Sequence, residues 1–276
     1  MKIHYFGTAA AEGVPAVFCR CDICRYAREH GGREIRTRAQ AMIDDTIMID
    51  FGPDSLFHAL RDGVDLTDLR YLLVTHAHGD HIQRDDLCNR QKNFAHLAED
   101  DPPLTVFCSA EVRDLLRPTA ENDLTGDGRV LFQTVEPFAP FLIEDYRITP
   151  LPARHGTEMP LIYMIEHDGK TFLYAHDTDV FFDEVWDYLT EHAVRFDAVS
   201  LDCTEGIKHI NYRGHMNFER DFEVRDKMLT TGLADGHTVF VANHFSHNGR
   251  ATYAEATKPE NAQGMLVSYD GMDLVI

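Results

Sequence analysis

The sequence predicts an α/β (α+β) fold within a single domain that spans residues 1–276. Apolar segments of strand length alternate with segments of helical length, an order that is typical of mixed α/β proteins. The alternation runs along the whole chain without a repeat, a low-complexity tract or a linker, although the length alone permits one or two domains. A chain of this length buries roughly 75% of the surface that it exposes on unfolding, so its core needs no disulfides.

In the N-terminal half, each predicted strand or hairpin is followed by a predicted helix. The strand segments are 2–7, 40–52, 69–75 and 104–108, and the helical segments are 24–30, 54–61, 82–97 and 109–116. Asp44-Asp45 supplies the turn chemistry of a hairpin within 40–52. Ser109 is a suitable N-cap for the last of these helices. The Asp-rich stretches 99–103 and 119–129 are expected to be solvated loops, and the alternative for either is a mobile lid.

The C-terminal half begins with a strand-rich region over 130–174, which is interrupted by turn residues at Glu144-Asp145 and His167-Asp168-Gly169. The remaining predicted elements are a helix over 181–192, a strand over 198–202, a helix over 217–232 capped by Asn217, a strand over 238–244 and a final strand pair around Tyr269-Asp270-Gly271.

Three histidines and an aspartate follow the apolar strand segment 71–74 within a few residues, and they are His76, His78, Asp80 and His81. Side chains alternate along extended backbone, so His76 and His78 point to one side. Asp80 and His81 fall at the turn into the next helix and face a neighbouring position. One ion cannot easily take all four side chains from so short a loop, so the spacing predicts two adjacent metals. The alternative is a His-rich loop that binds nothing.

This H-x-H-x-D-H string, together with single residues after later strand segments, resembles the metallo-β-lactamase superfamily of dinuclear metallohydrolases. The later residues are His155, Asp177 and His244. The resemblance implies a four-layer αββα sandwich, in which two mixed sheets pack face to face with helices outside. It also implies a ligand set with His76, His78 and His155 on one divalent metal, Asp80, His81 and His244 on the other, and Asp177 between them.

Three thiols are crowded into the loop near 19–24, at Cys19, Cys21 and Cys24. Thiolates this close repel one another unless a cation neutralises them, and zinc with Cys and His ligands is the usual solution. His247 is the best candidate for the fourth ligand, because three residues of extended chain after His244 let the two imidazoles face different ions. A disulfide is the alternative, although a bridge between thiols separated by one residue is strained.

The order C-x-C-x-x-C followed much later by H-x-x-H resembles the PhnP-like phosphodiesterases of the carbon–phosphorus lyase pathway, and segment 6–15 is similar to the opening of that family. The resemblance implies one structural zinc on Cys19, Cys21, Cys24 and His247. It also implies a cyclic phosphate substrate from phosphonate metabolism, such as phosphoribosyl cyclic phosphate, with 2′,3′-cyclic nucleotides as similar surrogates.

Two metals about 3.5 to 4 Å apart lower the pKa of a water between them towards ~7, which supplies hydroxide at neutral pH. Phosphodiester cleavage also needs a proton for the leaving alkoxide, and a histidine suits that role. His215 precedes the predicted helix capped by Asn217, completes neither metal site, and matches the region where the resembling phosphodiesterase has its general acid. His215 and Asp80 are therefore the predicted catalytic residues. The alternative for His215 is a surface position beside the helix cap.

Two other functions remain open: a hydrolase of lactones, thioesters or β-lactams that uses the same metals, and a metal-binding sensor without turnover. The His and carboxylate ligands suit zinc, manganese or iron, whereas the thiolates favour zinc. Asp50 is expected to support the metal loop from behind. Arg154, Arg213 and Lys208 are candidate phosphate contacts.

The formal net charge is −20, with 46 Asp and Glu against 26 Lys and Arg. Such a surface repels the backbone of a long nucleic acid but has less effect on a small substrate inside a pocket. We therefore expect a small phosphorylated substrate. The chain starts without the apolar region of a signal peptide, and no apolar run approaches the ~18 residues of a membrane span. A cytoplasmic enzyme without a membrane partner is expected, and a homodimer is compatible with the sequence.

Overall fold

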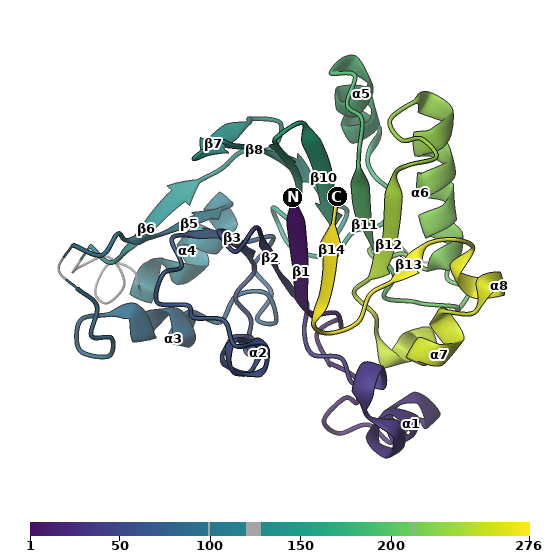
Figure 1. Cartoon of the computed structure of the whole chain (residues 1–276), viewed down its shortest axis with the longest axis horizontal. Coiled ribbons are helices and arrows are strands. Elements are labelled where there is room, and N and C mark those ends of the chain that lie inside the picture. The colour runs from purple at the N-terminus through teal and green to yellow at the C-terminus, as the bar shows by residue number, and fades with distance from the viewer. Residues whose placement is uncertain (99, 120–127, 212) are drawn as a thin grey trace.

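The computed structural model describes residues 1–98, 100–119, 128–211 and 213–276. Two seven-stranded sheets pack face to face, with helices on their outer sides (Figure 1). This is the αββα arrangement that the sequence resemblance implies, and the prediction of the fold class is confirmed. Among the described residues, no helix combines the length and apolar character needed to cross a bilayer.

The first sheet has the strand order β14-β1-β2-β3-β4-β5-β6. Its strands are β1 (Lys2–Gly7), β2 (Gln40–Ile43), β3 (Ile47–Ile49), β4 (Tyr71–Leu73), β5 (Leu104–Cys108), β6 (Val130–Thr134) and β14 (Met272–Val275). The strands from β3 to β6 are parallel, and the others pair antiparallel. Its helices are α2 (Ser55–Asp62), α3 (Arg84–Leu87) and α4 (Ala110–Thr119). Helix α1 (Asp22–His30) lies apart from them, at the lower end of the molecule in Figure 1.

The second sheet has the order β13-β12-β11-β10-β9-β8-β7. Its strands are β7 (Phe141–Ile143), β8 (Tyr146–Pro152), β9 (Leu161–His167), β10 (Lys170–Ala175), β11 (Ala198–Asp202), β12 (Val239–Asn243) and β13 (Leu266–Val267). Strands β10 to β13 are parallel. The helices on this side are α5 (Asp183–Glu191), α6 (Phe218–Thr231), α7 (Tyr253–Ala256) and α8 (Pro259–Ala262). Asn217 caps α6, as predicted, by accepting a hydrogen bond from the backbone N–H of Arg220.

The central strands are buried on both faces, which explains why they appear in the sequence as continuous apolar runs. Along β4, Leu73 packs between the two sheets, whereas Leu72 and Val74 pack against the helices outside. In β10, Tyr174 points between the sheets, and Leu173 points towards the helical layer on the other side. The alternation of side chains along a strand therefore fills three apolar layers from the same elements.

Two predicted elements differ from the structure. The helix expected over 82–97 is reduced to α3 and a short 3-10 turn, Cys88–Arg90. The backbone of Phe51 exchanges hydrogen bonds of 2.7 Å with His81 and Gln83, which holds the start of this segment extended. The strand pair expected around Tyr269-Asp270-Gly271 is also wrong, because β13 and β14 belong to different sheets. Most of the loop predicted over 119–129 lies outside the described residues.

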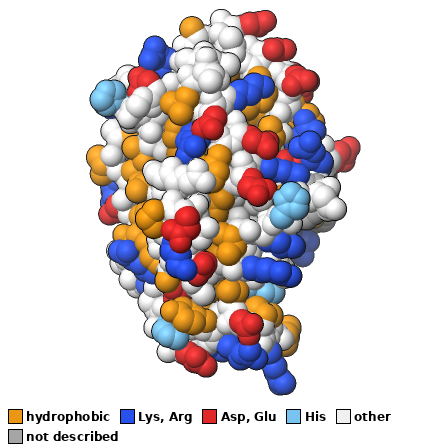
Figure 2. Space-filling view, turned by 90° about the vertical axis from the view of Figure 1, so that its right-hand side faces the viewer, with side chains coloured by type: hydrophobic (Ala, Val, Ile, Leu, Met, Phe, Trp, Pro, Cys, Tyr) orange, Lys and Arg blue, Asp and Glu red, His pale blue; other side chains and the backbone are white. Residues whose placement is uncertain are grey.

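The molecular face that carries α6 and α8 shows acidic and basic side chains interspersed with apolar ones (Figure 2). The large negative net charge is therefore not gathered into one continuous acidic surface on this face.

Candidate metal centres and active site

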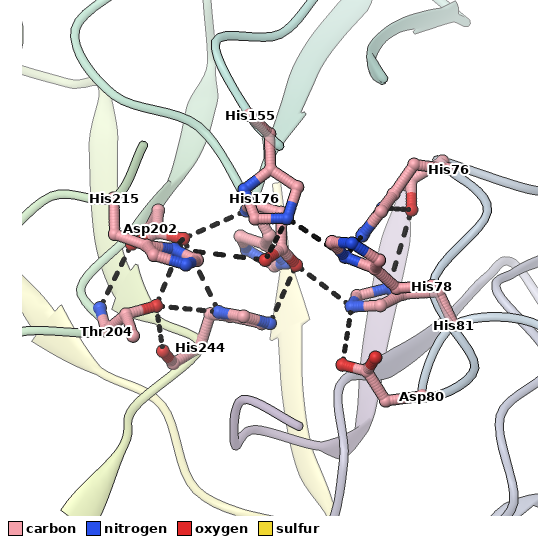
Figure 3. A network of polar contacts seen from close by, with 12 residues as sticks. His76, His78, Asp80, His81, His155, His176, Asp202, Thr204, His215 and His244 are labelled. Carbon is pink, nitrogen blue, oxygen red and sulfur yellow. Dashed lines mark hydrogen bonds and ion pairs between the residues drawn. The ribbon is translucent and has the colours of Figure 1, made fainter. Parts of the chain in front are cut away.

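The candidate catalytic residues meet at the edge where the parallel strands of both sheets end. The loop after β4 carries the H-x-H-x-D-H string, and His155, Asp177 and His244 follow β8, β10 and β12. Because the carboxyl ends of parallel strands lie at the same edge, loops that are far apart in the sequence converge here. Figure 3 shows the side chains of the labelled histidines and Asp80 gathered around one common space.

The first ligand group consists of His76, His78 and His155. Their ring nitrogens approach closely, with 2.9 Å from His76 Nε2 to His78 Nδ1 and 3.1 Å from His155 Nε2 to His78 Nδ1. One nitrogen from each ring lies within 4.8 Å of the others, as in a group that can share one ion.

The second group consists of Asp80, His81 and His244, whose ligand atoms also lie within 4.8 Å of one another. Asp177 joins the two groups. Its Oδ2 atom lies 2.9 Å from His81 Nε2 and 2.8 Å from His244 Nε2, and its Oδ1 atom lies 3.4 Å from His155 Nε2. One carboxylate thus faces both groups, which is the position of a bridging ligand.

Three buried atoms at the centre of this arrangement have no hydrogen-bond partner in the described structure: His81 Nε2, His244 Nε2 and Asp177 Oδ2. The Asp177 oxygen lies within 3 Å of each of the two nitrogens, but neither contact has the geometry of a hydrogen bond. Buried polar atoms normally have partners. A cation among these atoms would satisfy all three, so the residues fit a metal centre.

The charges of the site are strongly coupled. Burial disfavours the charged form of His244, but Asp177 and Asp202 together outweigh this effect and raise the pKa of His244 to about 10. Despite burial, the imidazoles of His244 and His81 hold the pKa of Asp177 well below its usual range. The imidazoles beside this buried carboxylate thus favour its charged form.

Supporting residues fix the rings from behind. Asp50 Oδ2 lies 2.7 Å from His81 Nδ1, as expected for a residue that supports the metal loop. Thr204 Oγ1 lies 2.8 Å from His244 Nδ1. Asp50, Asp177 and His244 each have a positive φ, of 65°, 51° and 63°. These left-handed residues turn the chain sharply where β3, β10 and β12 end, which places their side chains over the edge of the sheets.

His215 lies beside both ligand groups and lines a cavity of about 260 Å³ together with His78, His155 and His244. Its Nδ1 atom lies 3.1 Å from Asp202 Oδ2, so Nε2 is the nitrogen that remains for a substrate. Burial lowers the pKa of His215, but the charge and hydrogen bond of Asp202 and the charge of Asp177 together outweigh burial and raise this pKa above its ordinary value.

Two residues of the site, Asp202 and Thr204, were not predicted from the sequence. Asp202 is fully buried at the end of β11, and it also accepts hydrogen bonds from the backbone N–H groups of Asp177 and Met216. A signal was present in the sequence, because Asp202 ends its strand segment in the same way as Asp177 follows β10. His176, next to Asp177, lies 2.8 Å from the Ser200 hydroxyl and is a buried residue of the sheet.

The candidate phosphate contacts are largely engaged elsewhere. Arg213 pairs with Asp179 at 3.2 Å, and Lys208 pairs with Glu205 at 2.9 Å. The guanidinium of Arg154 stacks on the ring of Phe182 at 4.3 Å. Arg154 lines a neighbouring cavity that shares His155 with the site, rather than the site itself.

The four residues of the predicted structural zinc site also meet. The sulfur atoms of Cys19, Cys21 and Cys24 and one nitrogen of His247 lie within 4.8 Å of one another. His247 Nδ1 is 3.6 Å from Cys19 Sγ and 3.5 Å from Cys21 Sγ. Backbone N–H groups donate to all three sulfur atoms. None of the six cysteines, all within the described residues, forms a disulfide.

Sequence comparisons identify relatives of this chain. The sequence model described as Beta-lactamase superfamily domain matches residues 45–231, more than half of the chain. An octanoyltransferase of Porphyromonas gingivalis is 26% identical over 289 residues, which cover 100% of this chain and 52% of that protein. The chain thus spans about half the length of this curated relative.

Two solved structures share the fold. A diphosphatase from the PhnP family superposes with a TM-score of 0.76 at 19% identity, over 100% of this chain and 97% of that one. Zinc-bound PqqB from Methylobacterium extorquens superposes with a TM-score of 0.70 at 17% identity, over 100% of both chains.

Proposed function

This chain belongs to the beta-lactamase superfamily, and we propose that it is a dinuclear metal-dependent phosphodiesterase that hydrolyses a small cyclic phosphate ester of ribose. The observation that carries the proposal is the pair formed by His215 and Asp202, which faces the cavity directly beside both ligand groups. A carbonyl hydrolase that used the same metals would have no need of this pair.

The two catalytic divalent ions, zinc, manganese or iron, would be held by His76, His78 and His155 and by Asp80, His81 and His244, with Asp177 between them. When bound, a pair of ions at such a site lowers the pKa of a water between them and balances the charge of a phosphate. A third ion, zinc, would be held by Cys19, Cys21, Cys24 and His247, where four protein ligands leave no open position.

The side chains of this chain supply orientation and a proton. Asp202 accepts the Nδ1–H of His215 and fixes the ring, so Nε2 carries the proton that the leaving alkoxide needs. Thr204 and Asp50 hold His244 and His81 in the same way through their Nδ1 atoms. A cavity of about 260 Å³ admits a sugar-sized substrate, in keeping with the expectation that a long nucleic acid is not the partner.

His215→Ala tests this proposal. With metals bound, the variant should hydrolyse a ribose cyclic phosphate more slowly by roughly 10² to 10⁴, the usual size of general acid catalysis. A diester with a nitrophenolate leaving group needs little protonation, so its rate should fall much less. The measurement is kcat for both substrates, with elemental analysis showing unchanged metal content.

Two results would contradict the role of His215. Equal losses on both diesters would assign it to substrate positioning instead. Turnover of lactones or thioesters without turnover of any diester would replace the phosphodiesterase proposal by the carbonyl hydrolase.

A further inference from the structure

The charged residues that line the catalytic cavity, apart from its histidines, are all acidic: Glu12, Asp80, Asp177 and Glu205. Asp80 and Asp177 belong to the proposed ligand set, and Glu205 is paired with Lys208 at 2.9 Å. No lysine or arginine of the described residues lines this cavity. Glu12 therefore differs from the other three carboxylates. Within the described structure, its negative charge is balanced neither by the proposed metals nor by an ion pair with Lys or Arg.

Glu12 is held in place by the segment that follows His244. Asn248 Nδ2 donates a hydrogen bond of 3.1 Å to Glu12 Oε1, and the Ser246 hydroxyl donates one of 3.4 Å to Oε2. His247 Nε2 lies 3.9 Å from Oε1, on the side of the ring away from the cysteines. The side chain is still 40% exposed, so it can contact a bound molecule.

We propose that Glu12 determines which part of a substrate is accepted beside the reacting phosphate: an uncharged, hydroxyl-bearing sugar or nucleoside, and not a second phosphate. A carboxylate only accepts hydrogen bonds, so sugar hydroxyls are suitable partners. A second phosphate there would meet a like charge, which costs binding free energy and excludes the wrong ligand. This inference rests on the proposed function and selects between its two substrate types. It favours a nucleoside 2′,3′-cyclic phosphate with a free 5′-hydroxyl over phosphoribosyl cyclic phosphate.

The opposite preference, for a ligand with a second phosphate, could come from the adjacent cavity of about 630 Å³, which is lined by Lys208 and Arg250. Asn248 lines both cavities, so the Glu12–Asn248 contact is part of the wall that they share. Either cation could attract a second phosphate, although Lys208 is already paired with Glu205 at 2.9 Å. The experiment has to separate these two results.

The test is isothermal titration calorimetry on the metal-loaded full chain with adenosine 3′-monophosphate and adenosine 3′,5′-bisphosphate, which differ only at the 5′ position. The wild type should bind the bisphosphate about tenfold more weakly, because its second phosphate faces Glu12. Glu12→Gln keeps the size and the contact with Asn248 but removes the charge, so the two Kd values should become nearly equal. Glu223→Gln removes the same charge at an exposed position on α6, so it should leave the ratio of the two Kd values as in the wild type.

Tighter binding of the bisphosphate by the wild type, lost in Lys208→Ala or Arg250→Ala, would overturn the inference. So would equal Kd values in the wild type, or a ratio that Glu12→Gln does not change. The proposed function is tested separately with bis(p-nitrophenyl) phosphate, which carries neither a sugar hydroxyl nor a second phosphate. If the wild type hydrolyses neither this compound nor a cyclic nucleotide, the function fails, while the binding ratios still decide the role of Glu12.

Discussion

The two groups of candidate metal ligands differ in chemistry, in burial and in how the chain supports them. The catalytic group uses imidazoles and carboxylates at the ends of strands, and His76, His81, Asp177 and His244 are almost completely buried. The cysteine group uses three thiols and one imidazole on a loop, the start of α1 and a 3-10 turn, and only Cys24 is fully buried.

This difference indicates different roles. The proposed catalytic ligands follow strands of both sheets and line a cavity, which leaves room for a substrate. The cysteine group offers four ligands to one position, and burial raises the pKa of Cys24 to about 12, which disfavours its thiolate in the absence of a cation. We expect the first group to control turnover and the second to hold the N-terminal loop against the segment after β12.

The largest expected effect comes from Asp80→Ala. Removing this carboxylate should release one catalytic ion and lower kcat for a diester by about 10³ or more, because charge stabilisation in the site is lost. The cysteine-bound zinc should stay, which elemental analysis will measure. Asp85→Ala, an exposed change in α3, is the matched control. Full activity of Asp80→Ala would contradict the assignment of the ligands.

Cys21→Ser should have the opposite pattern. Cys21 is the N-cap of α1, and serine is also a good N-cap, so the substitution removes a metal ligand while it retains the cap. We expect the loss of one zinc from about three ions per chain and a Tm lower by several degrees, since metal binding contributes to folding. The catalytic pair should remain at least partly occupied.

Cys88→Ser controls for the loss of a thiol elsewhere in the chain. A fully active wild type with no more than two ions per chain would refute the cysteine site.

The smallest effect concerns a buried carboxyl group without a cation. Asp221 is fully buried in α6, neither of its oxygens has a hydrogen-bond partner in the described structure, and burial raises its pKa well above the ordinary value. Its neutral form is thereby favoured in the folded protein, whereas the pKa of Asp177 is lowered. The contribution of Asp221 to stability is present below the unfolded pKa of ~3.9 and is lost as the pH rises towards the folded pKa.

Asp221→Asn removes this titration. At pH 8 the Tm of the variant should exceed that of the wild type, by about 2 to 4 °C for each kcal/mol gained in the free energy of unfolding. The difference in Tm should shrink towards pH 4. Asp226→Asn, an exposed change on the same helix, should give no such trend. A difference in Tm that does not vary with pH would show that Asp221 is ionised in the folded state.

The sequence predicted the parts of the site in which chemistry is concentrated locally. His76, His78, Asp80 and His81 are close in the chain, so their spacing alone indicated metal binding. Asp202 was missed because its role depends on His215 and His244, which approach it only through the order of β10, β11 and β12.

In the fold, too, the features that depend on distant residues could not be predicted from the sequence. The apolar runs identified the strands, but the choice of sheet for β13 and β14 depends on neighbours that are distant in the sequence. The helix expected from residue 82 begins only at Arg84, because Phe51, some thirty residues earlier, pairs with the backbone on both sides of Ile82.

The left-handed backbone of Asp177 and His244 affects any attempt to rebuild the centre for another metal. Each of these residues provides both a donor atom and the reversal that ends its strand. Asparagine adopts this conformation readily, so it can exchange the donor at either position while it preserves the turn. A β-branched replacement would be strained there whatever its size. Libraries of substitutions at these two positions are therefore best restricted to Asn, Asp, His and Gly. His76 and His78 can be varied more widely, because neither has a positive φ.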